Sequence, residues 1–324
     1  MDIRMEIFVW LLILSVGLIL LVKGADFFVG GACALAARLG VAQLVIGLTV
    51  VAMGTSLPEA AVSISAVIKG NADITIGNVV GSNILNILII LGLSALITPL
   101  AVEKSTITIE LPFLTGVSIL LLLQGLDGTI GLADGIVQIL LFILYLTYLF
   151  WSAKKSNGQN SEPNTKPNEE VPAERKSQAI WKILLLCVLG LAMTVAGSNL
   201  AVDAACGIAK KLGMSERFIG LTIVALGTSL PELVTSITAA KKGEADIAIG
   251  NIVGSNIFNI LFVVGISALV HPVIFAQGFR FDSAISVVAA LSLILFCYKH
   301  KTLKRTHGAL LLAGYAAYFA AILF

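Results

Sequence analysis

Two glutamates with the same local sequence are the residues of this chain best suited to hold a cation. Glu59 ends a Gly-Thr-Ser-Leu-Pro-Glu run that begins at Gly54, and Glu232 ends an identical run that begins at Gly227. Both runs lie inside long apolar stretches, where an ionised carboxylate costs at least ~2.5–3.5 kcal/mol if the stretch crosses a membrane. The apolar stretches hold no Lys or Arg at similar depth except Lys23, which can extend to the interface. We therefore expect a bound cation, rather than a structural ion pair, to neutralise the two acids.

The residues just before each glutamate supply further oxygen atoms. A proline has no N–H, so Pro58 leaves the carbonyl of Gly54, and Pro231 that of Gly227, without its helical hydrogen bond. At membrane depth such a break is tolerated only where it lines a cavity. Carbonyls and hydroxyls are hard ligands, which suit Na⁺ or Ca²⁺ better than a soft transition metal. The hydroxyls expected beside the carboxylates are those of Thr55, Ser56, Thr228 and Ser229.

A second polar pattern, Gly-Asn-x-x-Gly-Ser-Asn-x-x-Asn, begins at Gly77 and again at Gly250. Its first asparagine, its serine and its last asparagine are four residues apart, so they stack on one face of a helix. We expect these side chains to coordinate the ion, with hydrogen bonding between helices as the alternative. They are Asn78, Ser82, Asn86, Asn251, Ser255 and Asn259. For the remaining pair, Asn83 and Asn256, both roles stay open.

The composition places these motifs in a membrane. The chain of 324 residues is 58% hydrophobic and 12% charged, with a mean hydropathy of +0.99, whereas soluble domains are about 45–50% apolar and ~25% charged. Long apolar runs such as 7–22 and 285–298 fit helices that cross the bilayer. The net charge of +2 does not indicate nucleic acid as a partner. The four cysteines show no C-x-x-C spacing, so we expect no metal or redox cofactor.

The chain is an internal duplication. A shift of 173 positions (219 − 46) lays 46–92 over 219–265 without a gap, and 32 of these 47 positions are identical. A polar, proline-containing segment, 154–177, separates the two copies and is typical of a flexible linker. We therefore expect a first repeat over 1–153, a cytoplasmic linker over 154–177 and a second repeat over 178–324.

Each repeat is expected to contain five spans, which makes the fold an all-α membrane protein with ten transmembrane helices. Because five is odd, the second repeat enters the membrane from the opposite side, and such inverted repeats carry their site near the midplane on broken helices. Lys and Arg concentrate on the linker's side, which predicts an external N-terminus. The first span of each repeat is long enough to be tilted, or kinked near Gly24 and Gly197. The expected spans are 5–38, 42–69, 73–97, 106–124, 130–153, 178–211, 215–242, 246–271, 280–300 and 305–324.

The doubled motif resembles the alpha repeats of the cation/calcium exchanger superfamily, and specifically the prokaryotic sodium/calcium exchangers. The resemblance covers essentially the whole chain. It implies an antiporter of the cell inner or plasma membrane in which cytosolic Ca²⁺ leaves as Na⁺ enters. It also implies alternating access, with the first and sixth helices sliding over a site between the second, third, seventh and eighth. By matching position, the implied ligands are Glu59, Glu232, Thr55, Ser56, Thr228, Ser229, Ser82, Ser255, Asn86 and Asn259, with the backbone carbonyls of Ala52 and Ala225.

Three alternatives remain at this point. A Ca²⁺/H⁺ antiporter of the same superfamily would use the two acids as proton carriers, but would not need the surrounding hydroxyls and amides. A channel would not need inverted repeats around a neutralised site. An intramembrane protease would need a Gly-x-Gly-Asp motif or a histidine near either glutamate, and the sequence has neither.

We expect no enzyme activity, no cofactor beyond the transported ions, and no obligate protein partner. The amide at Asn259, where potassium-dependent relatives carry aspartate, argues against K⁺ co-transport.

Overall fold

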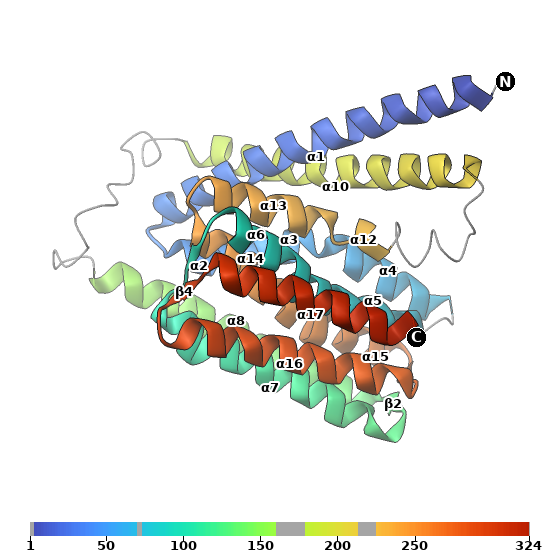
Figure 1. The fold of residues 1–324 in the computed structure, drawn as a ribbon. Helices are drawn as coiled ribbons and strands as arrows, with labels where there is room; N and C mark the ends of the chain where they lie inside the picture. Colours follow the sequence, from blue (N-terminus) through green and yellow to red (C-terminus); the bar gives the residue numbers. More distant parts are fainter. Residues whose placement is uncertain (1–2, 70–72, 160–178, 213–224, 324) are drawn as a thin grey trace.

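The computed structural model describes residues 3–69, 73–159, 179–212 and 225–323, and these ranges are almost entirely helical (Figure 1). Seven described helices are long and apolar enough to cross a membrane, and one bent pair forms an eighth when counted as a single span. Of the other two expected spans, 215–242 includes residues outside the described ranges, and 305–324 corresponds to α17 (Arg305–Leu323). The all-helical class is confirmed, while the ten-helix layout stays a prediction.

Two long helices, α1 (Ile3–Leu39) and α10 (Ile180–Lys211), run side by side along one flank of the molecule (Figure 1). Neither is interrupted at the glycines where a kink was a possibility. Gly24 and Gly197 instead let the backbones touch, because an added Cβ would lie 2.5 Å from the Thr194 nitrogen and 2.4 Å from the Leu21 nitrogen, respectively. Small residues of this kind permit close packing of membrane helices.

The centre of the molecule is formed by two helices that correspond at a spacing of 173 residues. The first consists of α5 (Asp73–Leu85), a π-helical turn (Asn86–Leu91) and α6 (Gly92–Ile97). The second repeats this order with α14 (Ala245–Phe258), a π-helical turn (Asn259–Val264) and α15 (Gly265–Val270). In the most apolar 18-residue stretch of each helix, 72% and 83% of the residues are buried, whereas only 11% are buried in that of α1. The two helices therefore form the core, and α1 lies at the periphery.

Broken helices pack against this core. The first is built from α2 (Gln43–Ile46), a π-helical turn (Gly47–Val51), α3 (Ala52–Thr55) and α4 (Leu57–Ile68). The second comprises α12 (Ala225–Gly227) and α13 (Leu230–Lys241).

The remaining helices complete the bundle on the flank away from α1 and α10 (Figure 1). They are a π-helical turn (Thr106–Glu110) leading into α7 (Leu111–Gln124), then α8 (Leu132–Gln159) and α16 (Gly278–Tyr298) beside α17. A short 3₁₀ turn (Gly125–Asp127) follows α7. Because α8 continues to Gln159, the described helix extends past 154, where the linker was expected to begin. The rest of that expected linker, from 160 onward, lies outside the described residues.

Four two-residue strands join the ends of these helices. Strand β1 (Leu100–Ala101) pairs antiparallel with β4 (Thr302–Leu303), and β2 (Thr129–Ile130) pairs antiparallel with β3 (Val273–Ile274). Strands β1 and β3 are 173 residues apart, as are β2 and β4, so each pair joins one strand from either half of the chain. Strands β4 and β2 lie at opposite ends of the bundle (Figure 1).

Candidate functional site

Each glutamate follows a break in its helix, as the prolines predict. The first half bends by 48° between Gln43–Thr55 and Leu57–Ile68. Ser56, at the break, has φ −83° and ψ 6°, and Ser229 has nearly the same conformation at φ −88° and ψ 3°. A proline lies in the first turn of the helix that follows each break, where its missing N–H costs the new helix no bond but leaves the carbonyl four residues earlier without its donor.

The two halves exchange hydroxyl contacts at their glutamates, which are both buried. The Ser56 hydroxyl donates to Glu232 Oε1 at 2.8 Å, and the Ser229 hydroxyl lies 3.3 Å from Glu59 Oε1. Thr55 likewise lies beside Glu232, and Thr228 beside Glu59. Each carboxylate is therefore contacted by the serine at the helix break of the opposite half.

A four-asparagine cluster lies between the two core helices. The Asn83 amide donates to the Asn256 carbonyl at 3.2 Å, and the Asn256 amide donates to the Asn83 carbonyl at 3.1 Å. The Asn86 amide donates to Asn256 Oδ1 at 2.9 Å, and the Asn259 amide donates to Asn83 Oδ1 at 3.1 Å. Asn83 and Asn256 therefore connect the helices and accept the amides of the other two asparagines, which favours the interhelical role of the two that the sequence left open.

Four buried oxygen atoms of the predicted site have no hydrogen-bond partner: Glu59 Oε2, Glu232 Oε2, Asn86 Oδ1 and Asn259 Oδ1. Leaving such atoms unpaired costs about 1–3 kcal/mol each, and more for a charged group. Because the amide nitrogens of Asn86 and Asn259 are already engaged, only their oxygens are available to a ligand. Among the described residues, neither glutamate forms an ion pair with a Lys or Arg. The donor set therefore fits a hard cation.

Other predicted ligands lie in the same cluster. Ser82 is 3.3 Å from the Ser229 hydroxyl, and the Ser255 hydroxyl donates to the Ala52 carbonyl at 3.3 Å. Ala225, the counterpart of Ala52, is the first residue of α12 in the second broken helix. The carbonyl of Ala52 is thus already an acceptor at the site.

The first asparagine of each motif is placed between helices. Asn78 donates to the Glu59 carbonyl at 3.1 Å and to the Ser63 hydroxyl at 2.9 Å. Asn251 donates to the Ser236 hydroxyl at 2.9 Å, while its Oδ1 accepts from Thr55 at 3.0 Å. These bonds hold the broken helices against the core. The bonds favour hydrogen bonding between helices as the role of Asn78 and Asn251. The sequence analysis had given this role as the alternative to ion coordination.

One expected ligand also accepts a hydrogen bond from another helix. The Gly227 carbonyl, which Pro231 frees, accepts a hydrogen bond of 2.9 Å from the Ser198 hydroxyl of α10. The sequence had assigned this carbonyl to the ion. The corresponding position of the first half is Ala25, so the contact has no counterpart there.

Sequence reasoning missed a third buried acid, Glu110, in the π-helical turn before α7. Its Oε1 accepts from the Tyr148 hydroxyl at 2.9 Å, while Oε2 has no partner. A related pair, Tyr318 donating to Asp282 at 3.0 Å, joins α17 to α16. The sequence did place one of these acids within each of the expected spans 106–124 and 280–300. Neither acid is surrounded by a repeated motif, so neither stood out as a candidate.

A family model described as sodium/calcium exchanger protein matches the chain twice, over residues 9–151 and 182–324. The sodium/calcium exchanger MaX1 of Methanosarcina acetivorans is 34% identical over 343 residues, covering 97% of this chain and 98% of that protein. The inner membrane protein YrbG of Escherichia coli is 36% identical over 313 residues, covering 95% of each. The solved structure of the sodium-calcium exchanger NCX_Mj soaked with 10 mM Na⁺ and zero Ca²⁺ gives a TM-score of 0.82 at 35% identity, covering 97% and 99%.

The fold and the oxygen-lined site define a helical membrane cation transporter, and the similarities place it among cation/calcium antiporters. The chain belongs to the sodium/calcium exchanger family, as the sequence motifs had implied.

Proposed function

We propose that this protein exchanges Na⁺ for Ca²⁺ across the membrane at a site built on Glu59 and Glu232. The observation that carries the proposal is the group of four buried, unpartnered oxygens, two of which belong to these carboxylates. Both glutamates are 1% exposed, so a carboxylate without a counter-charge would be strongly destabilised. A cation bound among these oxygens removes that cost.

The charge of the site accounts for exchange rather than one-way transport. Two ionised carboxylates carry a formal charge of −2, which one Ca²⁺ or more than one Na⁺ can neutralise. Both loads require the same oxygens, so they compete. The empty site leaves two close negative charges unscreened, so the protein crosses between its two states more readily when it is loaded.

We further propose that the chain forms two inverted five-helix repeats that alternate access to this site. The spacing of 173 residues between corresponding elements supports this layout, and so does the pairing of strands from different halves. The N- and C-termini lie at one end of the bundle, and the end of α8 and the start of α10 lie at the other (Figure 1). With the linker in the cytoplasm, both termini are external.

Uptake of ⁴⁵Ca²⁺ into proteoliposomes tests the proposal. Vesicles loaded with Na⁺ should take up Ca²⁺ when diluted into Na⁺-free buffer, whereas an imposed pH gradient alone should drive little uptake. Glu59→Gln and Glu232→Gln should each abolish uptake, while Glu103→Gln, an exposed acid outside the site, should retain it.

The two main alternatives give different results in the same experiment. Uptake driven by the pH gradient and not by Na⁺ would identify a Ca²⁺/H⁺ antiporter. Normal exchange by either glutamate variant would show that the ion binds elsewhere.

A further inference from the structure

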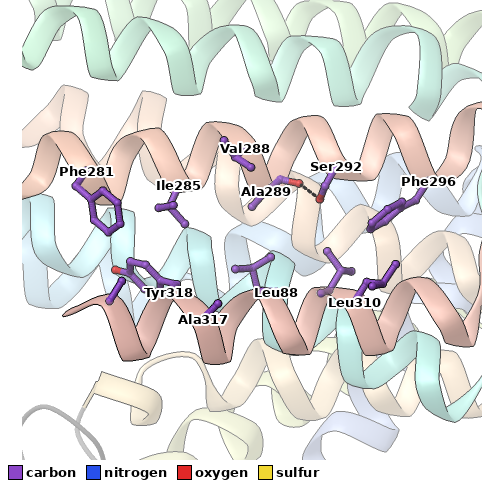
Figure 2. Close-up of a pocket in the computed structure, with 13 residues that line it drawn as sticks. Leu88, Phe281, Ile285, Val288, Ala289, Ser292, Phe296, Leu310, Ala317 and Tyr318 are labelled. Carbon is purple, nitrogen blue, oxygen red and sulfur yellow. Dashed lines mark hydrogen bonds between the residues drawn. The ribbon is translucent and has the colours of Figure 1, made fainter. Parts of the chain in front are cut away.

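An apolar groove of about 330 Å³ lies between α16 and α17, and none of the predicted ion ligands is in its lining. Figure 2 shows its two ends, with Phe281 and Tyr318 at one and Phe296 and Leu310 at the other. Leu88, from the π-helical turn that begins at Asn86, contributes to its lining. A groove of this size can hold a small ligand, and its lining is suited to an alkyl chain.

The Phe296 end of the groove opens beside a cluster of positive charge. We call residues 299–305 the basic loop; this segment contains four cations, Lys299, Lys301, Lys304 and Arg305, and no acid. All four are exposed. The pairing of β1 with β4 places one acid, Glu103, near the loop, together with a further cation, Lys104. The local charge therefore remains strongly positive.

His307 connects the basic loop to the wall of the groove. Its ring stacks on Phe296 with centroids 4.7 Å apart, and its Nδ1 accepts the backbone N–H of Lys304 at 3.2 Å. The opposite end of the groove is closer to neutral, because Tyr318 there donates to the carboxylate of Asp282, and the nearby cation Arg280 donates to the Leu126 carbonyl. An anionic group is thus favoured at the Phe296 end.

We propose that the groove and the basic loop together bind an anionic phospholipid from the leaflet on the linker's side. One acyl chain lies between α16 and α17, and the phosphate headgroup contacts the basic loop. Lysines near a membrane surface attract anionic lipid, and the apolar wall selects a molecule with an alkyl chain over a free phosphate. The bound chain touches Leu88, two residues from the predicted ligand Asn86.

Native mass spectrometry of the purified full chain tests this site directly. The protein is stripped of lipid and titrated with phosphatidylglycerol or with phosphatidylcholine of the same acyl chains. Phosphatidylglycerol should bind more tightly. The double variant Lys299→Gln/Lys304→Gln should lose roughly 30-fold in its affinity for phosphatidylglycerol, which corresponds to about 1 kcal/mol for each lysine. Lys241→Gln, an exposed lysine on α13, should bind like the unchanged protein.

A second variant tests the groove. Gly314 lies in its lining, and an added Cβ there meets only Leu88 Cδ2 at 4.0 Å, so Gly314→Phe can fill the space without a backbone clash. This variant should lose the bound phospholipid, whereas Ala316→Phe, exposed on the same helix but outside the groove, should keep it. Equal binding of the two lipids, or unchanged binding by Gly314→Phe, would overturn the proposal. So would a protein dimer that Gly314→Phe dissociates, because the groove would then hold a second copy of the chain.

Discussion

The serines at the two helix breaks reach across the molecule to the glutamate of the other half. Ser56 bonds Glu232 and Ser229 contacts Glu59, so each hydroxyl lies between two elements that must both be in place to form the site. A serine here can orient the carboxylate and can also offer its own oxygen to the ion.

Ser56→Ala should therefore weaken Ca²⁺ binding without unfolding the protein. A hydrogen bond to a charged group contributes about 1.5–3 kcal/mol, so the Ca²⁺ concentration for half-maximal uptake should rise by roughly tenfold or more. This concentration is measured from the dependence of ⁴⁵Ca²⁺ uptake into Na⁺-loaded vesicles on the external Ca²⁺ concentration. Ser65→Ala, an exposed serine on the same α4 helix, is the matched control and should leave uptake unchanged.

Glu110 gives a contrasting prediction at the same scale. Its carboxyl is buried with Tyr148 rather than with Glu59 and Glu232. Glu110→Gln keeps an oxygen that can accept from Tyr148, so both the thermal midpoint and the Ca²⁺ dependence of uptake should stay close to those of the unchanged protein. A tenfold shift in the Ca²⁺ dependence would mean that Glu110 is coupled to the ion site.

The sequence names the residues of the candidate site, but it does not predict their hydrogen-bond partners. The repeated motifs locate Glu59, Glu232 and the neighbouring hydroxyls, because a buried acid beside a proline is costly without a function. The sequence does not reveal that Asn83 and Asn256 bond each other, or that Ser198 bonds the Gly227 carbonyl. Those contacts join helices far apart in the chain, and no local pattern specifies which helices pack together.

Among the elements, the breaks were predictable and the π-helical turns were not. Pro58 and Pro231 fix where the helices restart, since a helix interior does not accept a proline without losing a bond. The turns at Asn86 and Asn259 have no such sequence signal. A wider turn changes the rotation of the helix at that point and is frequent at functional sites.

The contact of α1 with α10 gives a prediction about packing. An alanine at Gly197 would place Cβ 2.4 Å from the backbone nitrogen of Leu21. Such overpacking costs about 1–3 kcal/mol, so Gly197→Ala should lower the thermal midpoint and slow exchange.

Gly116→Ala provides the control for that substitution. Gly116 lies in α7, where an added Cβ meets nothing within 4 Å. Alanine favours a helix by up to about 1 kcal/mol relative to glycine, so the midpoint should rise slightly. Equal midpoints for the two variants, measured by thermal unfolding in detergent, would show that α1 and α10 do not pack this closely.

For the molecule as a whole, duplication made the correspondence between described elements of the two halves predictable. The spacing of 173 residues relates α4 to α13 and α5 to α14, so one half served as a guide to the other. The two strand pairs were missed, because two residues are too few to show an alternating pattern. These pairs join the halves at both ends of the bundle.

Because the proposed site takes residues from both halves, neither half should bind Ca²⁺ alone. Residues 1–165 and 166–324 expressed separately should show no Na⁺-dependent uptake, and the two expressed together should restore it. The cut lies between α8 and α10, so it removes no described contact. Activity of a single half would contradict a shared site.

The reciprocal bonds of Asn83 and Asn256 bear on how such a chain evolves. Each of the two side-chain amides donates to the backbone carbonyl of the other residue. Such reciprocal bonds are the geometry that a twofold axis imposes on a homodimer. In an ancestor with one repeat per chain, that asparagine would have met its own copy, and each mutation would have changed both sides of the site together. Fusion of two copies removes that constraint, which is how Ser198 can bond the break in one half while Ala25 occupies its place in the other.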